Sequence, residues 1–211
     1  NSILTCYAER KLQMKKTTIA LAVAASIFGA GCAEPVSNDV KVTTKPQNIL
    51  IAYYSYSGNT KFAAELIQKH TGGDLFETVP ETPYPSDYDA CVSQAKDEIR
   101  SGFKPQLKTQ VENFDQYDTI FIGTPNWWST MAPPVYSFIA GHDFSGKTVI
   151  PFVTHGGGGM ADCEEDIQKA AVNAKFGKGG AFRGSNIRNS EEAVAKWVNE
   201  VISVQTEEVK Q

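Results

Sequence analysis

Hydroxyl side chains surround a single glycine in the stretch YYSYSGNTK, which covers residues 53–61. The apolar run ILIA precedes this stretch and the helix-like run AAELIQKH follows it, so it should form the turn from a strand into a helix. A helix start offers free backbone N–H groups and the positive end of the helix dipole, which together attract an anion. Short hydroxyl side chains add further donors. The residues expected to bind a phosphate group here are Ser55, Ser57, Gly58, Asn59 and Thr60.

A purely structural role for the same side chains is the alternative. Ser57 or Asn59 could simply cap a helix that begins at Thr60, because Ser and Asn are common capping residues. The nucleotide-triphosphate loop is excluded, because its spacing GxxxxGK[ST] is absent and Gly58 is followed by the run NTK. The turn is therefore interpreted as either a phosphate site or a helix cap.

Apolar runs alternate with helical patterns throughout residues 48–204. The expected strands are residues 49–54, 74–79, 118–123, 147–154 and 179–184. The expected helices are residues 60–72, 88–102, 132–143, 161–174 and 190–203. This alternation predicts an α/β fold of three layers, in which a five-stranded parallel sheet carries helices on both faces. In such open sheets, ligands bind beyond the carboxyl ends of the strands, where the strand order reverses.

The motif SYSGNT, residues 55–60, resembles the phosphate-binding loop of the flavodoxin family, whose pattern is S/T-x-S/T-G-x-T. The resemblance extends from about residue 48 to about residue 202. It implies a flavodoxin-like fold and FMN as the cofactor, with the FMN phosphate held by this loop. Flavodoxin is a standard example of FMN bound where the strand order reverses, so this placement follows from the resemblance and not from the residues alone.

A second loop, GTPNWWSTMAPP, covers residues 123–134 after the third expected strand. A flat flavin ring needs apolar or aromatic surface against its faces and hydrogen bonds along its edge. We expect Trp127 and Trp128 to supply the surface, and the family resemblance places this loop against the ring. In the alternative, one of these tryptophans packs into the core under the third helix. A turn with edge-directed polar groups is expected from Thr124, Pro125, Asn126, Ser129 and Thr130.

A third loop, THGGGGMAD, covers residues 154–162 after the fourth expected strand. Consecutive glycines allow positive φ angles and a close approach of the backbone to a bound ring. We expect Thr154, His155, Gly156 and Gly157 to contribute to the FMN site. His155 could hydrogen-bond the pyrimidine edge of the flavin or act on a substrate, and a solvent-exposed or structurally bonded histidine is the alternative. The spacing GxGxxA loosely fits the dinucleotide fingerprint, but it follows the fourth strand instead of the first.

Two redox functions are open for a protein that holds FMN. The first is an electron carrier that exchanges electrons with a partner protein. The second is an FMN-dependent NAD(P)H:quinone or small-acceptor oxidoreductase, because the loop GTPNWWSTMA is similar to that of flavodoxin-like quinone reductases. Those enzymes tend to carry an arginine where this chain has Trp127, which argues against their mode of nucleotide binding. We prefer the carrier, because no nucleotide fingerprint occurs in its proper context and the chain is expected to be exported. The sequence lacks the GxSxG turn of serine hydrolases, and it contains no His/Cys/Asp cluster that would indicate a metal site.

Residues 14–32 have the pattern of a secretory signal: a basic start, an apolar stretch too short to span a bilayer comfortably, and small residues at the end. Their last residues, FGAGC, resemble a bacterial lipoprotein signal, in which the cysteine becomes the lipidated first residue. We therefore expect export to the extracytoplasmic side of a bacterial membrane, with Cys32 as the lipid anchor. Residues 33–47 are expected to be a flexible tether, residues 1–13 an upstream remnant and residues 205–211 a polar tail.

The charge and the cysteines add two further expectations. The formal net charge is −4, and the removal of residues 1–32 would take away four basic residues and one acidic residue, which leaves −7. An acidic body argues against nucleic acid as a partner. Cys91 and Cys163 lack metal-ligand spacing. A disulfide between them is possible in an exported protein, and two free, partly buried thiols are the alternative that we prefer.

Overall fold

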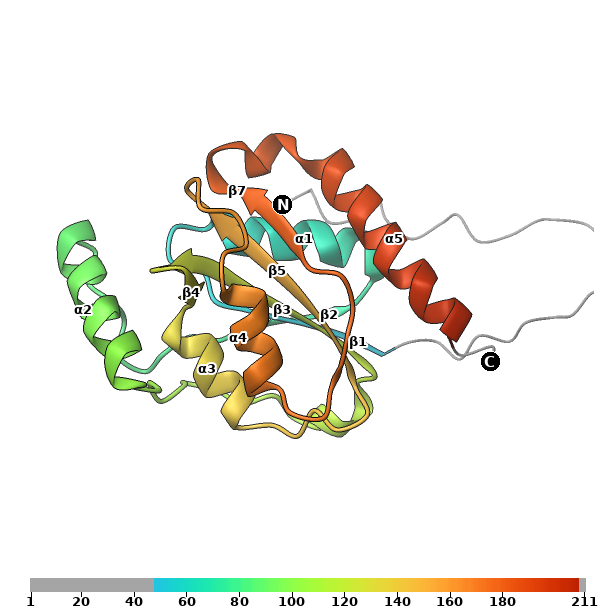
Figure 1. Cartoon of the computed structure of the whole chain (residues 1–211), viewed down its shortest axis with the longest axis horizontal. Coiled ribbons are helices and arrows are strands. Elements are labelled where there is room, and N and C mark those ends of the chain that lie inside the picture. Colours follow the sequence, from blue (N-terminus) through green and yellow to red (C-terminus); the bar gives the residue numbers. More distant parts are fainter. Residues whose placement is uncertain (1–47, 209–211) are drawn as a thin grey trace, which may run out of the picture. The chain divides into compact units, whose positions relative to one another are not determined.

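The computed structural model describes residues 48–208, with side chains described as far as residue 203. Strands and helices alternate along this part of the chain (Figure 1). The strands are β1 (Ile49–Tyr53), β2 (Asp74–Glu77), β3 (Thr119–Trp127), β4 (Thr130–Met131), β5 (Thr148–His155), β6 (Lys175–Phe176) and β7 (Gly180–Arg183). The α-helices are α1 (Asn59–Thr71), α2 (Tyr88–Ser101), α3 (Pro133–Ala140), α4 (Cys163–Ala170) and α5 (Glu191–Glu208).

A single sheet forms the middle layer, with the strand order β2-β1-β3-β5-β6. β6 pairs with the first residues of β5, and β7 pairs with its last residues. All of these pairings are parallel, whereas the short β4 pairs antiparallel with β3. The strand order reverses at β1, which lies between β2 and β3. The α/β architecture predicted from the sequence is therefore confirmed.

Two hydrophobic cores form because each face of the sheet is covered by helices. On one face, α1 and α5 pack small and branched residues such as Ala64 and Val198 against Ile51 and Phe121 of the strands. On the other face, α3 and α4 pack against alternate residues of the same strands, such as Ile120. The central strands are buried on both faces, which explains their nearly continuous apolar sequences.

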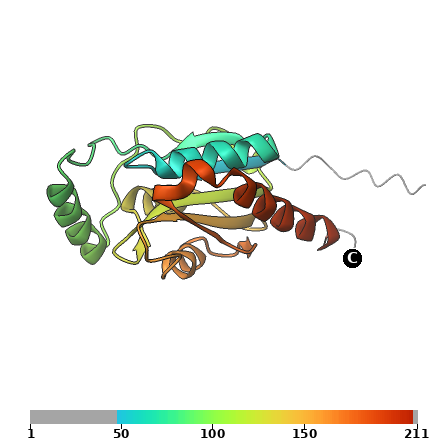
Figure 2. The same ribbon diagram turned by 90° about the horizontal axis from the view of Figure 1, so that it is seen from above.

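Helix α2 is an exception, because it stands away from the sheet in both views (Figure 2). Only Cys91 and Ala95 are buried among its 14 residues. Its first turn is capped by Asp87, whose side chain accepts a hydrogen bond from the backbone N–H of Ala90. The edge strand β2 is left only half covered as a result.

Some predicted boundaries differ from the structure. The sheet has seven strands instead of five, because the two-residue strands β4 and β6 are too short to leave a periodic signal in the sequence. β3 was expected to end at Gly123 but continues to Trp127. Helix α5 continues to Glu208, which lies within the predicted polar tail 205–211. The predicted remnant, signal, lipid anchor and tether all lie outside the described residues.

The described part of the chain contains no helix that is long and apolar enough to cross a membrane. Cys91 and Cys163 are free and buried, which confirms the preferred interpretation of two thiols. Burial raises the pKa of the Cys163 thiol to about 12, so this thiol stays protonated at neutral pH.

Candidate functional site

The three candidate loops leave the same edge of the sheet. β1, β3 and β5 are adjacent and parallel, so their carboxyl ends lie together. The first loop, residues 54–58, follows β1; the second lies at the end of β3; and the third, residues 156–162, follows β5. The predicted site residues therefore come from one region of the molecule.

The first loop ends in a helix start that has no side-chain cap. Gly58 is the N-cap residue of α1, with φ of 84°, and no side chain bonds to the first turn. The first intrahelical bond runs from the N–H of Phe62 to the carbonyl of Gly58, at 3.0 Å. The preceding N–H groups have no helical acceptor, as at any helix start. This arrangement leaves donors available for an anion.

Ser55 carries an unusual hydroxyl in this loop. Its Oγ is buried, yet it has no hydrogen-bond partner among the described residues. A buried polar atom without a partner costs about 1–3 kcal/mol, so such an atom in a native fold calls for a binding partner. A phosphate oxygen next to the start of α1 would supply one. The loop therefore fits a phosphate group on its own geometry.

The helix-cap alternative is wrong. α1 begins at Asn59, and neither Ser57 nor Asn59 caps it. Instead, the Asn59 Nδ2 donates to the Ser57 Oγ at 3.2 Å, which holds these two side chains together at the exposed rim of the loop. The two hydroxyl positions of the motif thus differ, since Ser55 is inside and Ser57 is exposed.

Thr60 connects the first loop to β5. Its Oγ1 lies 2.8 Å from the Oγ1 of Thr154, and both side chains are buried. A hydroxyl can donate one hydrogen bond and accept two, so this pair still leaves one donor and several acceptor positions between the two residues. The bond fixes the first turn of α1 against the end of β5.

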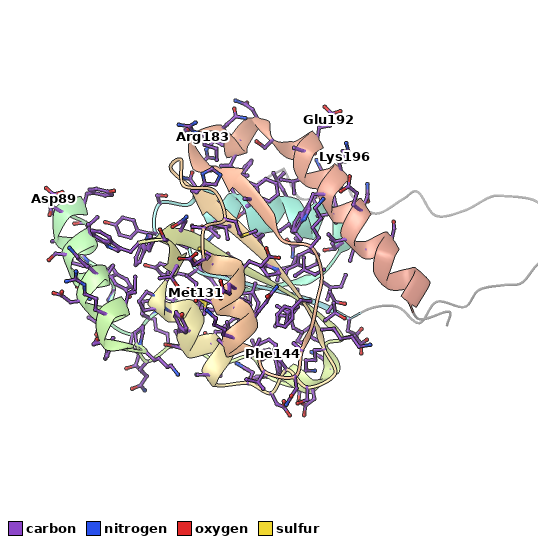
Figure 3. All side chains as sticks on the ribbon, in the orientation of Figure 1. Asp89, Met131, Phe144, Arg183, Glu192 and Lys196 are labelled. Atoms are coloured by element: carbon purple, nitrogen blue, oxygen red, sulfur yellow. The ribbon has the colours of Figure 1, made fainter. Side chains whose placement is uncertain are left out.

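The second loop is a tight hairpin between β3 and β4. Trp127 pairs with Thr130, and the two-residue turn between them is formed by Trp128 and Ser129, with φ of 53° and 70°. Turns of this kind normally use Asn-Gly, because bulky residues are strained at positive φ. The hairpin then returns Met131 into the core, where it is fully buried (Figure 3).

Asn126 fastens the hairpin to the third loop. Its Oδ1 accepts a hydrogen bond from the backbone N–H of Ser129 at 3.1 Å, and its Nδ2 donates to the carbonyl of Gly159 at 3.0 Å. The backbone N–H of Asp162 adds a bond to the carbonyl of Ser129 at 2.9 Å. The second and third loops therefore form one unit, and the Asn126 side chain is used within it.

Thr124 and Pro125 hold the base of the hairpin. The Thr124 Oγ1 donates to the carbonyl of Pro125 and accepts from the backbone N–H of Ala132, both at 2.9 Å. Thr124 is fully buried, and Pro125 pairs with Thr154 in the sheet. The Thr124 side chain thus supports the loop itself, and its expected contact with a ligand stays a prediction.

The third loop combines open space with an unpaired histidine. A Cβ atom at Gly156 or Gly157 would meet nothing within 4 Å, and only Gly159 of the four glycines has a positive φ, of 65°. His155 is half-buried, and its Nδ1 is buried without a partner among the described residues. A histidine held by a structural hydrogen bond was one alternative, but the Nδ1 atom has no such bond in the described part of the chain. This atom can therefore bind a group placed against the loop.

The two tryptophans have different surroundings. Trp127 is half-buried, and its ring centroid lies 5.0–5.9 Å from those of three tyrosines in edge-on contacts, namely Tyr54, Tyr56 and Tyr84. It also packs against the core that contains residues of α3, so one tryptophan does pack inward. Trp128 is 51% exposed, and its Nε1 donates to the carbonyl of Val92 in α2 at 3.2 Å.

The sequence analysis missed the tyrosines and the end of β7. Tyr84 bonds through its hydroxyl to Glu98 of α2, and burial, followed by this bond, raises the pKa of Tyr84. At the other side of the site, a Cβ atom at Gly184 would lie 2.7 Å from the Asn59 Nδ2, so the residue that follows β7 lies against Asn59, where α1 begins. The run YYSY could have indicated an aromatic cluster. The sequence around Gly184 contains no motif that would have placed this residue at the site.

Comparison with known families identifies the family of this chain. The family model described as Flavodoxin matches residues 48–201. The chain belongs to the flavodoxin family. A crystal structure from Bacteroides eggerthii, assigned as a flavoprotein, is 33% identical to this flavodoxin-family protein, with a TM-score of 0.65, and the match covers 74% of this chain and 98% of that one.

Two further structures support the assignment to flavodoxins. One, also assigned as a flavoprotein, comes from Bacteroides uniformis, with 33% identity, a TM-score of 0.66, and coverage of 74% of this chain and 99% of that one. The other is a flavoprotein in complex with FMN from Lactobacillus acidophilus, with 25% identity, a TM-score of 0.56, and coverage of 68% and 97%. A search of curated proteins gives no match to this flavodoxin-family chain.

The link between the second and third loops of this flavodoxin can be tested with Asn126→Ala. Both side-chain bonds are lost and the carbonyl of Gly159 loses its donor, so we expect the free energy of unfolding to fall by about 1–3 kcal/mol. Urea denaturation measures this change. The matched control is Asn186→Ala, because its amide makes a long, exposed contact of 3.4 Å with the Ser190 hydroxyl and its loss should change stability little. Equal effects of the two substitutions would contradict the link.

Proposed function

We propose that this flavodoxin-family protein binds FMN and transfers electrons to or from a redox partner. The observation that carries the proposal is the buried, unpartnered Oγ of Ser55 beside the uncapped start of α1. Support for FMN in particular comes from the Lactobacillus acidophilus flavoprotein, whose structure contains it. Bound FMN supplies one-electron and two-electron chemistry, and the protein supplies binding, orientation and electrostatics.

The described residues fit both ends of FMN, its phosphate and its ring. The first loop would hold the phosphate through Ser55, the N–H groups after Gly58 and the remaining hydrogen-bonding capacity of Thr60. The open Gly156–Gly157 segment would admit the ring next to the third loop, and the unpaired His155 Nδ1 would bind a polar group at its edge. The joined second and third loops would keep that position fixed.

The charge of the protein favours a particular class of partner. A formal net charge of −4 disfavours added negative charge on the cofactor, which lowers its reduction potential. The same charge attracts partners with basic surfaces and speeds their association. We infer that a redox partner protein presents a positive patch to this molecule.

A second candidate function is an FMN-dependent oxidoreductase with a small acceptor. A pocket lined by aromatic side chains of the second loop and of α2 favours it, because an acceptor could bind there without a partner protein. The position of Trp127 argues against nicotinamide nucleotides as the reductant, since flavodoxin-like quinone reductases tend to carry an arginine there. We therefore place this candidate second.

Export is part of the same proposal. The signal pattern of residues 14–32 and the candidate lipid site at Cys32 would put the domain at the extracytoplasmic surface of a bacterial membrane. Nicotinamide nucleotides are scarce there, which favours exchange with a membrane-bound or secreted partner. Labelling of cells with a lipid precursor, with Cys32→Ser as the control, would detect the anchor. An unlabelled protein would rule it out.

Cofactor choice gives the main test. We expect the protein to bind FMN with 1:1 stoichiometry and FAD much more weakly, because the first loop would surround a terminal phosphate. Flavin fluorescence, followed during titration with each flavin, measures both affinities. An absence of saturable FMN binding would remove the proposed function.

Ser55→Ala separates ligand binding from folding. The Ser55 hydroxyl is buried without a protein partner, so its loss should not lower the stability of the flavin-free protein and should raise it if the cost of the unpaired group is relieved. The affinity for FMN should fall by about 1–3 kcal/mol, the usual contribution of a charge-assisted hydrogen bond, while riboflavin binding stays the same. As a control, Thr60→Ala should also lower stability, because it breaks the buried bond to Thr154. Equal losses for FMN and riboflavin would contradict the phosphate assignment.

The electron source distinguishes the two candidate functions. We expect the FMN-loaded protein to oxidise NADH and NADPH at negligible rates in the presence of a quinone, because no arginine occupies the position of Trp127. Absorbance of the reduced nucleotide at steady state measures this rate. Rapid nucleotide oxidation that is lost in Trp127→Ala, and retained in the remote control Phe103→Ala, would favour the oxidoreductase.

A further inference from the structure

Trp127 is surrounded by tyrosines whose rings are close enough to exchange electrons with it directly. Its ring centroid lies 5.0 Å from that of Tyr84, 5.5 Å from that of Tyr54 and 5.9 Å from that of Tyr56. Rings at these separations are in contact, so an electron can pass between them without an intermediate group. Indole and phenol are among the side chains that lose a single electron most readily. An oxidised Trp127 could therefore draw an electron from a neighbouring tyrosine.

The surroundings of Trp197 show that packing around an indole does not by itself require tyrosines. Trp197 makes two edge-on ring contacts of the same kind, at 5.8 Å with Phe121 and at 5.5 Å with Phe182. A phenylalanine ring fills space much as a tyrosine ring does, but an oxidised indole cannot take an electron from it. The three hydroxyls around Trp127 thus add a chemical property that the packing of the core does not need.

Only one of these tyrosines has a base for its proton. Loss of an electron makes a phenol a strong acid, so its proton must leave with the electron. Within the described residues, only the hydroxyl of Tyr84 among the three donates to a carboxylate, that of Glu98, at 2.5 Å, which is the length of a charge-assisted bond. The Tyr56 hydroxyl donates to the backbone carbonyl of Pro85 at 2.7 Å, and a carbonyl oxygen is too weak a base to take the proton.

The Glu98 carboxylate is held in place for this transfer. One of its oxygens accepts the bond from Tyr84, and the other accepts a bond from the Gln94 Nε2 at 2.8 Å. Burial, followed by the bond to Glu98, raises the pKa of Tyr84, so the phenol carries its proton at neutral pH. The proton therefore has to move when Tyr84 is oxidised, and the existing hydrogen bond lets it move in one step.

We infer that Tyr84 and Glu98 form a proton-coupled redox site that takes oxidising equivalents from Trp127. A one-electron oxidant, such as an inorganic radical in solution, first removes an electron from the indole of Trp127 and leaves a radical cation. One electron then passes from Tyr84 to the indole, and the phenolic proton passes to the Glu98 carboxylate. The products are the intact indole, a neutral tyrosyl radical and a neutral carboxyl group, so electrons, protons and charge all balance.

The transfer would carry the radical away from the candidate cofactor loops. Tyr84 precedes α2, and Glu98 belongs to α2, which stands away from the sheet (Figure 1). Because Tyr84 is only half-buried, small reductants in solution, such as thiols, can return its radical to the phenol. The site would thus protect Trp127 from irreversible oxidation. The transfer needs no flavin, so this inference and FMN binding can fail separately.

Pulse radiolysis of the flavin-free full chain with azide radicals tests the inference. These radicals oxidise tryptophan preferentially, and the absorbance bands of the indolyl and phenoxyl radicals are followed separately. Tyr88→Phe is the background for every variant, because Tyr88 is 71% exposed and would otherwise be oxidised directly. We expect the indolyl band to decay and the phenoxyl band to grow at one common rate that does not depend on protein concentration. Deuterated water should slow this phase, because a proton moves with the electron.

Matched substitutions identify the residues of the relay. Tyr84→Phe and Trp127→Phe should each reduce the amplitude of this phase at least tenfold, whereas the controls Tyr54→Phe and Tyr56→Phe should retain it. Glu98→Gln keeps a hydrogen-bond acceptor but provides no base, so it should slow the phase at least tenfold. An undiminished phase in Tyr84→Phe or in Trp127→Phe, or an unchanged rate in Glu98→Gln, would each overturn the inference.

Discussion

The parallel order of β1, β3 and β5 is the constraint on which the rest of the molecule depends. Parallel strands need crossover helices, and these helices return each strand to the same starting edge, so every loop that follows a strand lies at the opposite edge. Three segments that are distant in the sequence meet there as a result. The bond between the hydroxyls of Thr60 and Thr154, and the bond from the Asn126 amide to the carbonyl of Gly159, then join these segments. The sheet brings the loops together, and these few polar bonds set their spacing.

Much of this arrangement could be predicted because it depends on periodic or local signals. Buried parallel strands have continuous apolar runs, and SYSGNT follows the first of them directly, so the fold and the phosphate loop were both predictable. The hairpin was not, because Trp128 and Ser129 adopt positive φ without the Asn-Gly pair that marks such turns. The hydrogen bonds of the Thr124 side chain were not predictable either, since its partners are fixed only when the loop closes.

Helix α2 shows what a pattern in one segment cannot reveal. Its sequence predicts a helix, and the helix forms, but its docking depends on residues elsewhere in the chain. Trp128 binds its backbone at Val92, and Tyr84 binds its side chain at Glu98. These contacts draw α2 toward the loop edge and away from β2. The position of α2 depends on a few aromatic and polar contacts and not on a wide apolar face. The periodicity of the sequence therefore gives little information about it.

The turn at Trp128 combines backbone strain with contacts to α2. Glycine at this position would adopt the observed φ of 53° without strain, and the hairpin would gain stability. The same change would remove the indole ring from the wall that faces α2 and leave the carbonyl of Val92 without its donor. The strain in the turn is therefore set against the contacts that hold α2 at the hairpin, and a change that relieves the first also removes the second.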